Sequence, residues 1–278
     1  MLLSNVVLNY CLIFGKGGFP VMGIAGAAIA SSVSEAVSLL FFIIYTGTTA
    51  DKRKYGFRRA FTFRPHLLKG MLSISGWTMV QSFISVSIWF IFFLAIEHLG
   101  ERPLAVTNIV RNISALLIMV ISAFATTAGA LISNQIGAGE QRYLFRTCGM
   151  TLNLTYAILV PLLVILCLFP EPVLRVFTDN PSLIAASINS VYVMSTSTLI
   201  MAPAFILFNA VSGTGNTKAG FIMEMISLTV YTAAVYYIVI RLKPDVALCW
   251  FSEHVYGIAL IALAWWYLKS GKWRGKKV

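Results

Sequence analysis

The chain has 278 residues, of which 58% are hydrophobic and only 11% are charged, and its formal net charge is +11. A soluble domain is about half apolar and about a quarter charged, so a water-soluble fold has too little interior for these side chains. The composition therefore predicts an integral membrane protein, and the position of the basic residues between apolar segments argues against a nucleic-acid partner.

Eight apolar segments follow one another along the chain, and their long uninterrupted runs indicate helices rather than the alternating strands of a barrel. The first, 1–14, is too short to cross a hydrocarbon core of about 30 Å at about 1.5 Å per residue. The segments long enough to span the membrane are 23–45, 70–98, 104–132, 148–169, 183–211, 219–240 and 246–268. We therefore predict an all-α, polytopic helical bundle.

Basic residues are unevenly divided between the connectors of these segments. Fifteen lie in the connectors on one side and in the C-terminal tail, and five lie in the connectors on the other side. Because basic loops stay in the cytoplasm, this predicts a protein of the cell (inner) membrane with a cytoplasmic C-terminus. The stretch "YGFRRAFTF" in the longest basic connector is expected to lie on the membrane surface.

The tetrapeptide pattern Ser-Glu-x-Val occurs twice, around Glu35 and around Glu253, and each copy opens an inward-running span with a basic exit. This is typical of a parallel internal repeat of two bundles. The second bundle would then be complete, whereas the first would lack about four spans before Met1. We expect the last two helices of an N-terminal lobe at 1–46, a cytoplasmic connector at 47–69, a six-helix C-terminal lobe at 70–268 and a basic cytoplasmic tail at 269–278.

Three stretches resemble the MATE (multidrug and toxin extrusion) family of transporters. They are "NVVLNYCLIFGKGGFPVMGIAGAAIASSVSE", similar to the end of the fifth helix and the start of the sixth, "NIVRNISALLIMVISAFATTAGALISNQIGAGE", similar to the eighth helix, and "FNAVSGTGNTKAG", similar to the loop after the tenth. The resemblance implies a two-lobe architecture of twelve helices, with most of the N-terminal lobe missing here. It also implies export of organic cations or drug-like molecules by alternating access, in exchange for Na⁺ or H⁺.

The chain departs from the family pattern at the positions where the family usually couples ions. Gln81 stands where sodium-driven members carry a glutamate in the seventh helix, and the tenth helix offers Asn209 but no aspartate. The first helix, which carries a coupling aspartate in proton-driven members, is absent.

Four charged side chains interrupt the apolar spans: Glu35, Glu224, Glu253 and Arg111. A charge near the bilayer centre costs about 2.5–3.5 kcal/mol, so each is expected to face a bundle interior or water. The glutamates are candidates for binding a coupling ion, or alternatively for tying helices together, and we expect Glu224 to reach the inner interface. Arg111 either pairs with a carboxylate in the cleft or extends to the outer headgroups, and we favour the second alternative.

Polar and adaptable side chains on helical faces are candidates for lining a substrate cleft. Amides need several hydrogen-bond partners, and methionine and aromatic faces repack around varied ligands. Core packing and hydrogen bonding between helices are the alternative. The candidates are Gln81, Asn108, Asn112, Met201, Phe205 and Asn209, beside a polar stripe at Ser75, Thr78, Ser82 and Ser85.

The sequence carries no nucleophile elbow, HExxH or Walker motif, and its four cysteines have no metal-ligand spacing. We therefore expect no enzymatic activity, no metal, and no cofactor beyond the coupling Na⁺ or H⁺. The expected partners are a small organic cation and the bilayer, and the expected state is a monomer. Two alternatives remain: a flippase for lipid-linked oligosaccharide precursors on a related two-lobe fold, and a fragment that does not transport by itself.

Overall fold

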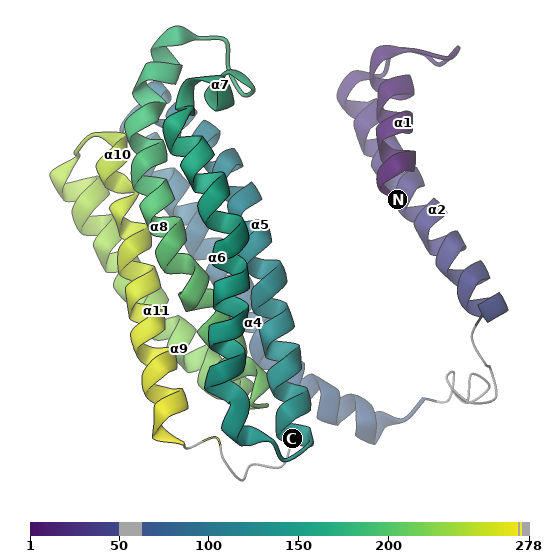
Figure 1. Cartoon of the computed structure of the whole chain (residues 1–278). Coiled ribbons are helices and arrows are strands. Elements are labelled where there is room, and N and C mark those ends of the chain that lie inside the picture. Colours follow the sequence, from purple (N-terminus) through teal and green to yellow (C-terminus); the bar gives the residue numbers. More distant parts are fainter. Residues whose placement is uncertain (50–62, 272, 274–278) are drawn as a thin grey trace. The chain divides into compact units, whose positions relative to one another are not determined.

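The computed structural model of the chain describes residues 1–49, 63–271 and 273, which form two compact units, Met1–Pro65 and His66–Val278 (Figure 1). The unit boundary lies inside the predicted connector 47–69. The stretch "YGFRRAFTF", for which we predicted a surface helix, lies outside the described residues. The assignment of the two units to two lobes of a transporter stays a prediction.

The first unit is a helical hairpin of α1 (Leu2–Phe14) and α2 (Gly23–Thr49). Gly15 ends α1 in the left-handed conformation, with φ of 65°, which glycine adopts at little cost. The helices approach so closely that a Cβ atom on Gly26 would lie 2.7 Å from the carbonyl oxygen of Leu12. The hairpin is therefore held by backbone contact at a small residue.

The second unit is a bundle of long helices that run up and down beside one another (Figure 1). Its long elements are α4 (Pro65–Glu97), α5 (Glu101–Gly137), α6 (Leu144–Leu168), α8 (Pro181–Gly213), α9 (Thr217–Val235) and α11 (Phe251–Ser270). Short elements connect them: η1 (Gln141–Tyr143), α7 (Pro170–Arg175), the π-helical turn η2 (Tyr236–Leu242) and α10 (Val246–Cys249).

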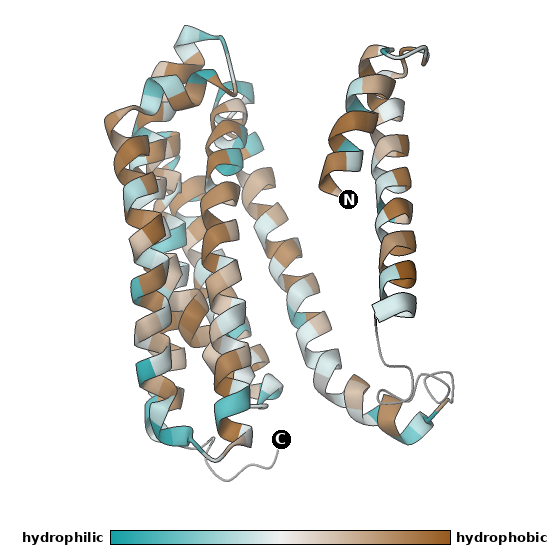
Figure 2. Ribbon diagram, turned by 45° about the vertical axis from the view of Figure 1, so that its right-hand side comes forward, coloured by the Kyte–Doolittle hydropathy of each residue, from teal (hydrophilic) through white to brown (hydrophobic). Residues whose placement is uncertain are grey.

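All seven predicted spans are confirmed as helices long and apolar enough to cross a membrane. Two of them are less regular than expected: α9 ends at Val235 and continues as the π-helical turn, and the last span is broken at Trp250 between α10 and α11. Large apolar side chains remain exposed along the helices, and Figure 2 colours the hydrophobic residues along each helix brown. Such a surface fits hydrocarbon rather than water.

Helix α8 forms the centre of the bundle, because 56% of its apolar 18-residue stretch is buried. Asn180 caps its start by accepting a hydrogen bond from the backbone N–H of Ser182 at 3.0 Å, and Pro181 occupies its first turn. At its other end α8 packs directly on α5, where a Cβ atom on Gly213 would lie 2.5 Å from the carbonyl oxygen of Gly129. This packing fixes the two helices that form one wall of the site described next.

Candidate functional site

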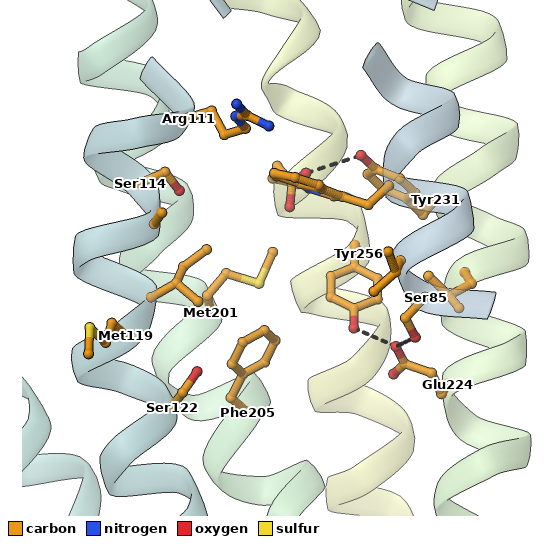
Figure 3. Close-up of a pocket in the computed structure, with 16 residues that line it drawn as sticks. Ser85, Arg111, Ser114, Met119, Ser122, Met201, Phe205, Glu224, Tyr231 and Tyr256 are labelled. Atoms are coloured by element: carbon orange, nitrogen blue, oxygen red, sulfur yellow. Dashed lines mark hydrogen bonds between the residues drawn. The ribbon is translucent and has the colours of Figure 1, made fainter. Parts of the chain in front are cut away.

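A cavity of about 450 Å³ lies within the second unit, lined by side chains from α4, α5, α8, α9 and α11 (Figure 3). Much of its wall is apolar or aromatic. Its polar members include two glutamates, two tyrosines and one arginine, all on membrane-spanning helices. A charged side chain within a membrane span has an unfavourable free energy unless it faces another charged group or a water-filled cavity. The position of these charged residues on the cavity wall therefore explains how the helices accommodate them.

The carboxyls of Glu224 and Glu253 are held by a crossed pair of tyrosines. The hydroxyl of Tyr231 on α9 donates to Glu253 Oε1 on α11 at 3.1 Å, and the hydroxyl of Tyr256 on α11 donates to Glu224 Oε1 on α9 at 2.9 Å. The two rings meet edge to face, with centroids 5.9 Å apart. Each helix thus supplies one acid and one phenol, and the contact ties α9 to α11 in both directions.

The spacing of these residues explains why one face of each helix carries both groups. Glu224 and Tyr231 are seven residues apart on α9, which is about two helical turns. Glu253 and Tyr256 are three residues apart on α11, which places them as neighbours on the helix surface. Each helix therefore carries its acid and its phenol on one face, and the structure brings these two faces together.

Glu224 has a second hydrogen-bonding neighbour on a third helix, because the hydroxyl of Ser85 on α4 lies 2.9 Å from the same Oε1. The residue is 4% exposed, and its other oxygen, Oε2, has no hydrogen-bond partner within the described part of the chain. A buried carboxyl oxygen without a donor is costly. Oε2 is therefore the atom available to a proton or to a bound cation.

Our expectation that Glu224 reaches the inner interface is wrong. Its carboxyl is buried between α4, α9 and α11 because Ser85 and Tyr256 hold it there. The ammonium of Lys218, near the start of α9, lies 5.7 Å from the centre of the Trp77 ring.

Arg111 does not pair with a carboxylate of the described residues, which was one of our two interpretations, and its extension to the outer headgroups stays a prediction. Its guanidinium carbon lies 5.0 Å from the ring centre of Phe93 and 6.0 Å from that of Trp89, both on α4. In the described ranges no carboxylate lies within ion-pair distance of it. Arg111 lines the main cavity and also a neighbouring one of about 420 Å³, which includes Glu97 and Asn108.

The other cleft candidates are only partly brought together. Met201 and Phe205 line the main cavity, whereas Asn112 is exposed and lies outside both cavities. The amide of Asn209 donates within its own helix, to the carbonyl oxygen of Phe205 at 2.9 Å. Gln81 is half-buried and takes no place in the wall of either cavity.

Glu35 lies in the first unit, where its side chain is exposed. Its role as an ion-coupling residue stays a prediction.

Trp89, Tyr231 and Tyr256 line the cavity and were not predicted from the sequence as site residues. The signal that could have found the tyrosines is their helical spacing from Glu224 and Glu253. Tyrosine and tryptophan are common in membrane helices, so their presence alone carries little information.

Comparison with known sequences gives a family. The MatE family profile matches residues 78–238. The probable multidrug resistance protein NorM of Thermotoga maritima is 26% identical, over 99% of this chain and 59% of the relative. The uncharacterized transporter YisQ of Bacillus subtilis is 25% identical, over 82% of this chain and 50% of the relative.

Comparison with solved structures gives the fold. An outward-facing multidrug resistance MATE family transporter of the MOP superfamily superposes with a TM-score of 0.82 at 17% identity, covering 96% of this chain and 59% of that one. A MOP superfamily transporter from Pyrococcus furiosus superposes with a TM-score of 0.81 at 18% identity, covering 96% and 60%. The chain spans about half to three-fifths of the length of these relatives.

Proposed function

Since the chain belongs to the MatE family, whose profile matches more than half of it, we propose that it serves to export organic cations or related drug-like molecules in exchange for Na⁺ or H⁺. The observation that supports this proposal is the cavity in which α9 and α11 present two carboxyls beside an aromatic and thioether wall. We place the protein in the cell (inner) membrane as a monomer with its C-terminus in the cytoplasm.

The carboxyls of Glu224 and Glu253 provide the coupling site in this proposal. Oxygen ligands suit hard cations such as Na⁺, and a carboxylate also accepts a proton. Tyr231, Tyr256 and Ser85 are neutral, so their hydroxyls orient the carboxyls without cancelling their charge. The site therefore keeps negative charge that a coupling ion or an organic cation can neutralise.

Competition for these carboxyls links the two fluxes. An organic cation places its apolar body against Met201 and Phe205 and its charge toward the carboxyls, and a coupling ion that occupies the carboxyls displaces it. In an exchanger, binding of the coupling ion must lower the affinity for the organic cation, and binding of the organic cation must lower the affinity for the ion. Two ligands that bind the same carboxyls lower each other's affinity in this way.

Efflux of a cationic dye from cells expressing the chain tests the proposal. We expect Glu224→Gln and Glu253→Gln each to slow ion-driven efflux at least about tenfold, because each removes a charged contact worth more than about 1.4 kcal/mol. Glu101→Gln is the matched control, since Glu101 is exposed at the start of α5 and lines neither cavity, and it should leave efflux unchanged. Glu35→Gln tests the remaining candidate in the same assay.

The amount of each variant in the membrane must match that of the unmodified chain, as measured on immunoblots. At matched amounts, unchanged efflux in both cavity variants would assign Glu224 and Glu253 to helix packing and would contradict the proposed coupling site.

A further inference from the structure

We propose that the groove between α4 and α5 binds a membrane phospholipid with an ethanolamine-type headgroup, whose phosphate contacts Arg111 and whose ammonium contacts Glu97. The groove is the neighbouring cavity of about 420 Å³, and the residues that line it belong to these two helices alone. The inference goes beyond the proposed function, because the lipid is a resident of the protein and not its cargo.

The groove is formed by one face of each helix. Helix α5 contributes Leu104, Asn108 and Arg111, which are four and three residues apart and therefore share a face. The residues from α4 are likewise three or four apart or adjacent, and all but the last are apolar or aromatic: Val86, Trp89, Phe90, Phe93, Leu94 and Glu97. The groove thus carries its charged groups toward the α4–α5 connector and apolar surface away from it.

The apolar part of this surface continues along α4 beyond the groove. Phe90 is 61% exposed and Val86 is 70% exposed, and the same face goes on at Phe83 and Met79, which are 74% and 66% exposed. From Met79 to Phe90 the helix rises about 16 Å. A continuous apolar path of this length beside a charged end has the polarity of a lipid, with room for an acyl chain along the helix.

Arg111 presents unused hydrogen-bond donors to the groove. Its guanidinium lies 5.0 Å from the ring centre of Phe93 and 6.0 Å from that of Trp89. Such cation–π contacts fix the group but do not use the N–H donors at its edge, and the described part of the chain offers it no carboxylate partner. A phosphate accepts two parallel hydrogen bonds from this fork, and the amide of Asn108 is a further donor on the same face.

The length of α5 places Arg111 near the level of the lipid phosphates. The helix has 37 residues and is therefore about 56 Å long, whereas the hydrocarbon core is about 30 Å thick. With the excess divided equally, about 13 Å of helix projects at each end. Arg111 is ten residues, or about 15 Å, from the start of α5 at Glu101. Its guanidinium thus lies close to the boundary where the headgroups begin.

Glu97 supplies the opposite charge at the spacing that an ethanolamine headgroup requires. Its exposed side chain lines the same groove, and it is four residues, or about 6 Å, nearer the connector than Phe93, whose ring holds the guanidinium. In the lipid, two carbon atoms separate the ammonium from the phosphate. A primary ammonium donates hydrogen bonds to a carboxylate, whereas a choline group has no N–H donor and a glycerol headgroup has no positive charge. Glu97 therefore selects ethanolamine over both.

Native mass spectrometry of the purified whole chain, released from a sugar detergent with one lipid added at a time, tests the inference. The lipids are phosphatidylethanolamine, phosphatidylcholine and phosphatidylglycerol with identical acyl chains. We expect phosphatidylethanolamine to bind at least about tenfold more tightly than phosphatidylglycerol, which lacks the ammonium and brings a net negative charge to Glu97, and more tightly than phosphatidylcholine. Equal affinities for the three lipids would overturn the inference and leave the export of cations standing.

Variants identify the two contacts separately. Arg111→Gln should weaken phosphatidylethanolamine binding at least about tenfold, whereas Glu97→Gln should bring the affinities for phosphatidylethanolamine and phosphatidylglycerol to within about threefold of each other. Arg102→Gln is the control at the same end of α5, because Arg102 is exposed, lies outside the groove and contacts Ser182. A preference for ethanolamine that survives Glu97→Gln would contradict the assignment. If Arg111→Gln does not fold, as judged by size exclusion and helicity, Glu97→Gln still decides the question.

Competition identifies the source of the bound group. Lysophosphatidylethanolamine, which keeps one acyl chain, should displace the bound lipid, and phosphoethanolamine, which has none, should not. Displacement by phosphoethanolamine would reassign the groove to a soluble phosphate compound. Dansylcadaverine, a fluorescent organic cation without a phosphate, should also leave the lipid in place. Displacement by this cation would make the groove part of the cargo site, and either result would overturn the inference.

Discussion

The hydroxyl of Tyr256 provides one half of the crossed contact between α9 and α11, and it is one of two hydroxyls at Glu224 Oε1. We predict that Tyr256→Phe lowers the free energy of unfolding by about 1 kcal/mol, because it removes one hydrogen bond to a buried carboxyl without creating a large void. Unfolding in sodium dodecyl sulfate, followed by helicity, measures the change.

Tyr237→Phe is the matched control, since Tyr237 is 61% exposed. The two variants lose the same atom, and only the first should change the unfolding curve. Equal stabilities of the two variants would show that the Tyr256 contact contributes nothing to the α9–α11 pairing.

At the scale of single residues, the sequence predicts some functional side chains well and others poorly. Glu224, Glu253 and Arg111 stand out because a charge inside an apolar span needs a physical reason. Their partners do not stand out, because a tyrosine is as compatible with a lipid-facing position as with a buried one. The burial of Glu224 could not be predicted, because it depends on Ser85 and Tyr256, which belong to other helices.

At the scale of single elements, the contact between α5 and α8 depends on the absence of a side chain at Gly213. A Cβ atom there would lie 2.5 Å from the carbonyl oxygen of Gly129, which is backbone and cannot rotate away. We predict that Gly213→Ala lowers the free energy of unfolding by about 1–3 kcal/mol, the usual cost of overpacking. The detergent unfolding assay used for Tyr256 measures it.

Gly149→Ala is the control for this substitution, because a Cβ atom on Gly149 of α6 would meet nothing within 4 Å. That variant should be unchanged or more stable by up to about 1 kcal/mol, since alanine favours a helix over glycine. A Gly213→Ala variant as stable as Gly149→Ala would mean that the two helices separate without cost.

The elements themselves follow from the sequence more closely than their irregularities do. Seven spans are predicted because an apolar run of sufficient length has only the helix available to it in hydrocarbon. Neither the break at Trp250 nor the π-helical turn Tyr236–Leu242 contains a glycine or a proline that would predict it. The residues inside these two irregularities therefore do not predict them.

At the scale of the whole molecule, the distribution of basic residues predicts which connectors face the cytoplasm. We predict that a cysteine at Asn180, between α7 and α8, reacts with a membrane-impermeant maleimide in intact cells, whereas one at Glu140, between α5 and α6, reacts only after the cells are opened. Both are introduced into a variant whose native cysteines are replaced by serine. The opposite labelling pattern would invert the orientation.

The central claim of this account is that a coupling ion and an organic cation compete for the carboxyls of Glu224 and Glu253. The affinity of the purified chain for dansylcadaverine, measured across a series of Na⁺ concentrations with K⁺ as replacement and again across a series of pH values, tests it most directly. We predict that the affinity falls as Na⁺ or H⁺ rises, and that the double variant Glu224→Gln, Glu253→Gln loses this dependence. An unmodified chain that binds the probe with an affinity independent of both Na⁺ and pH would contradict the claim.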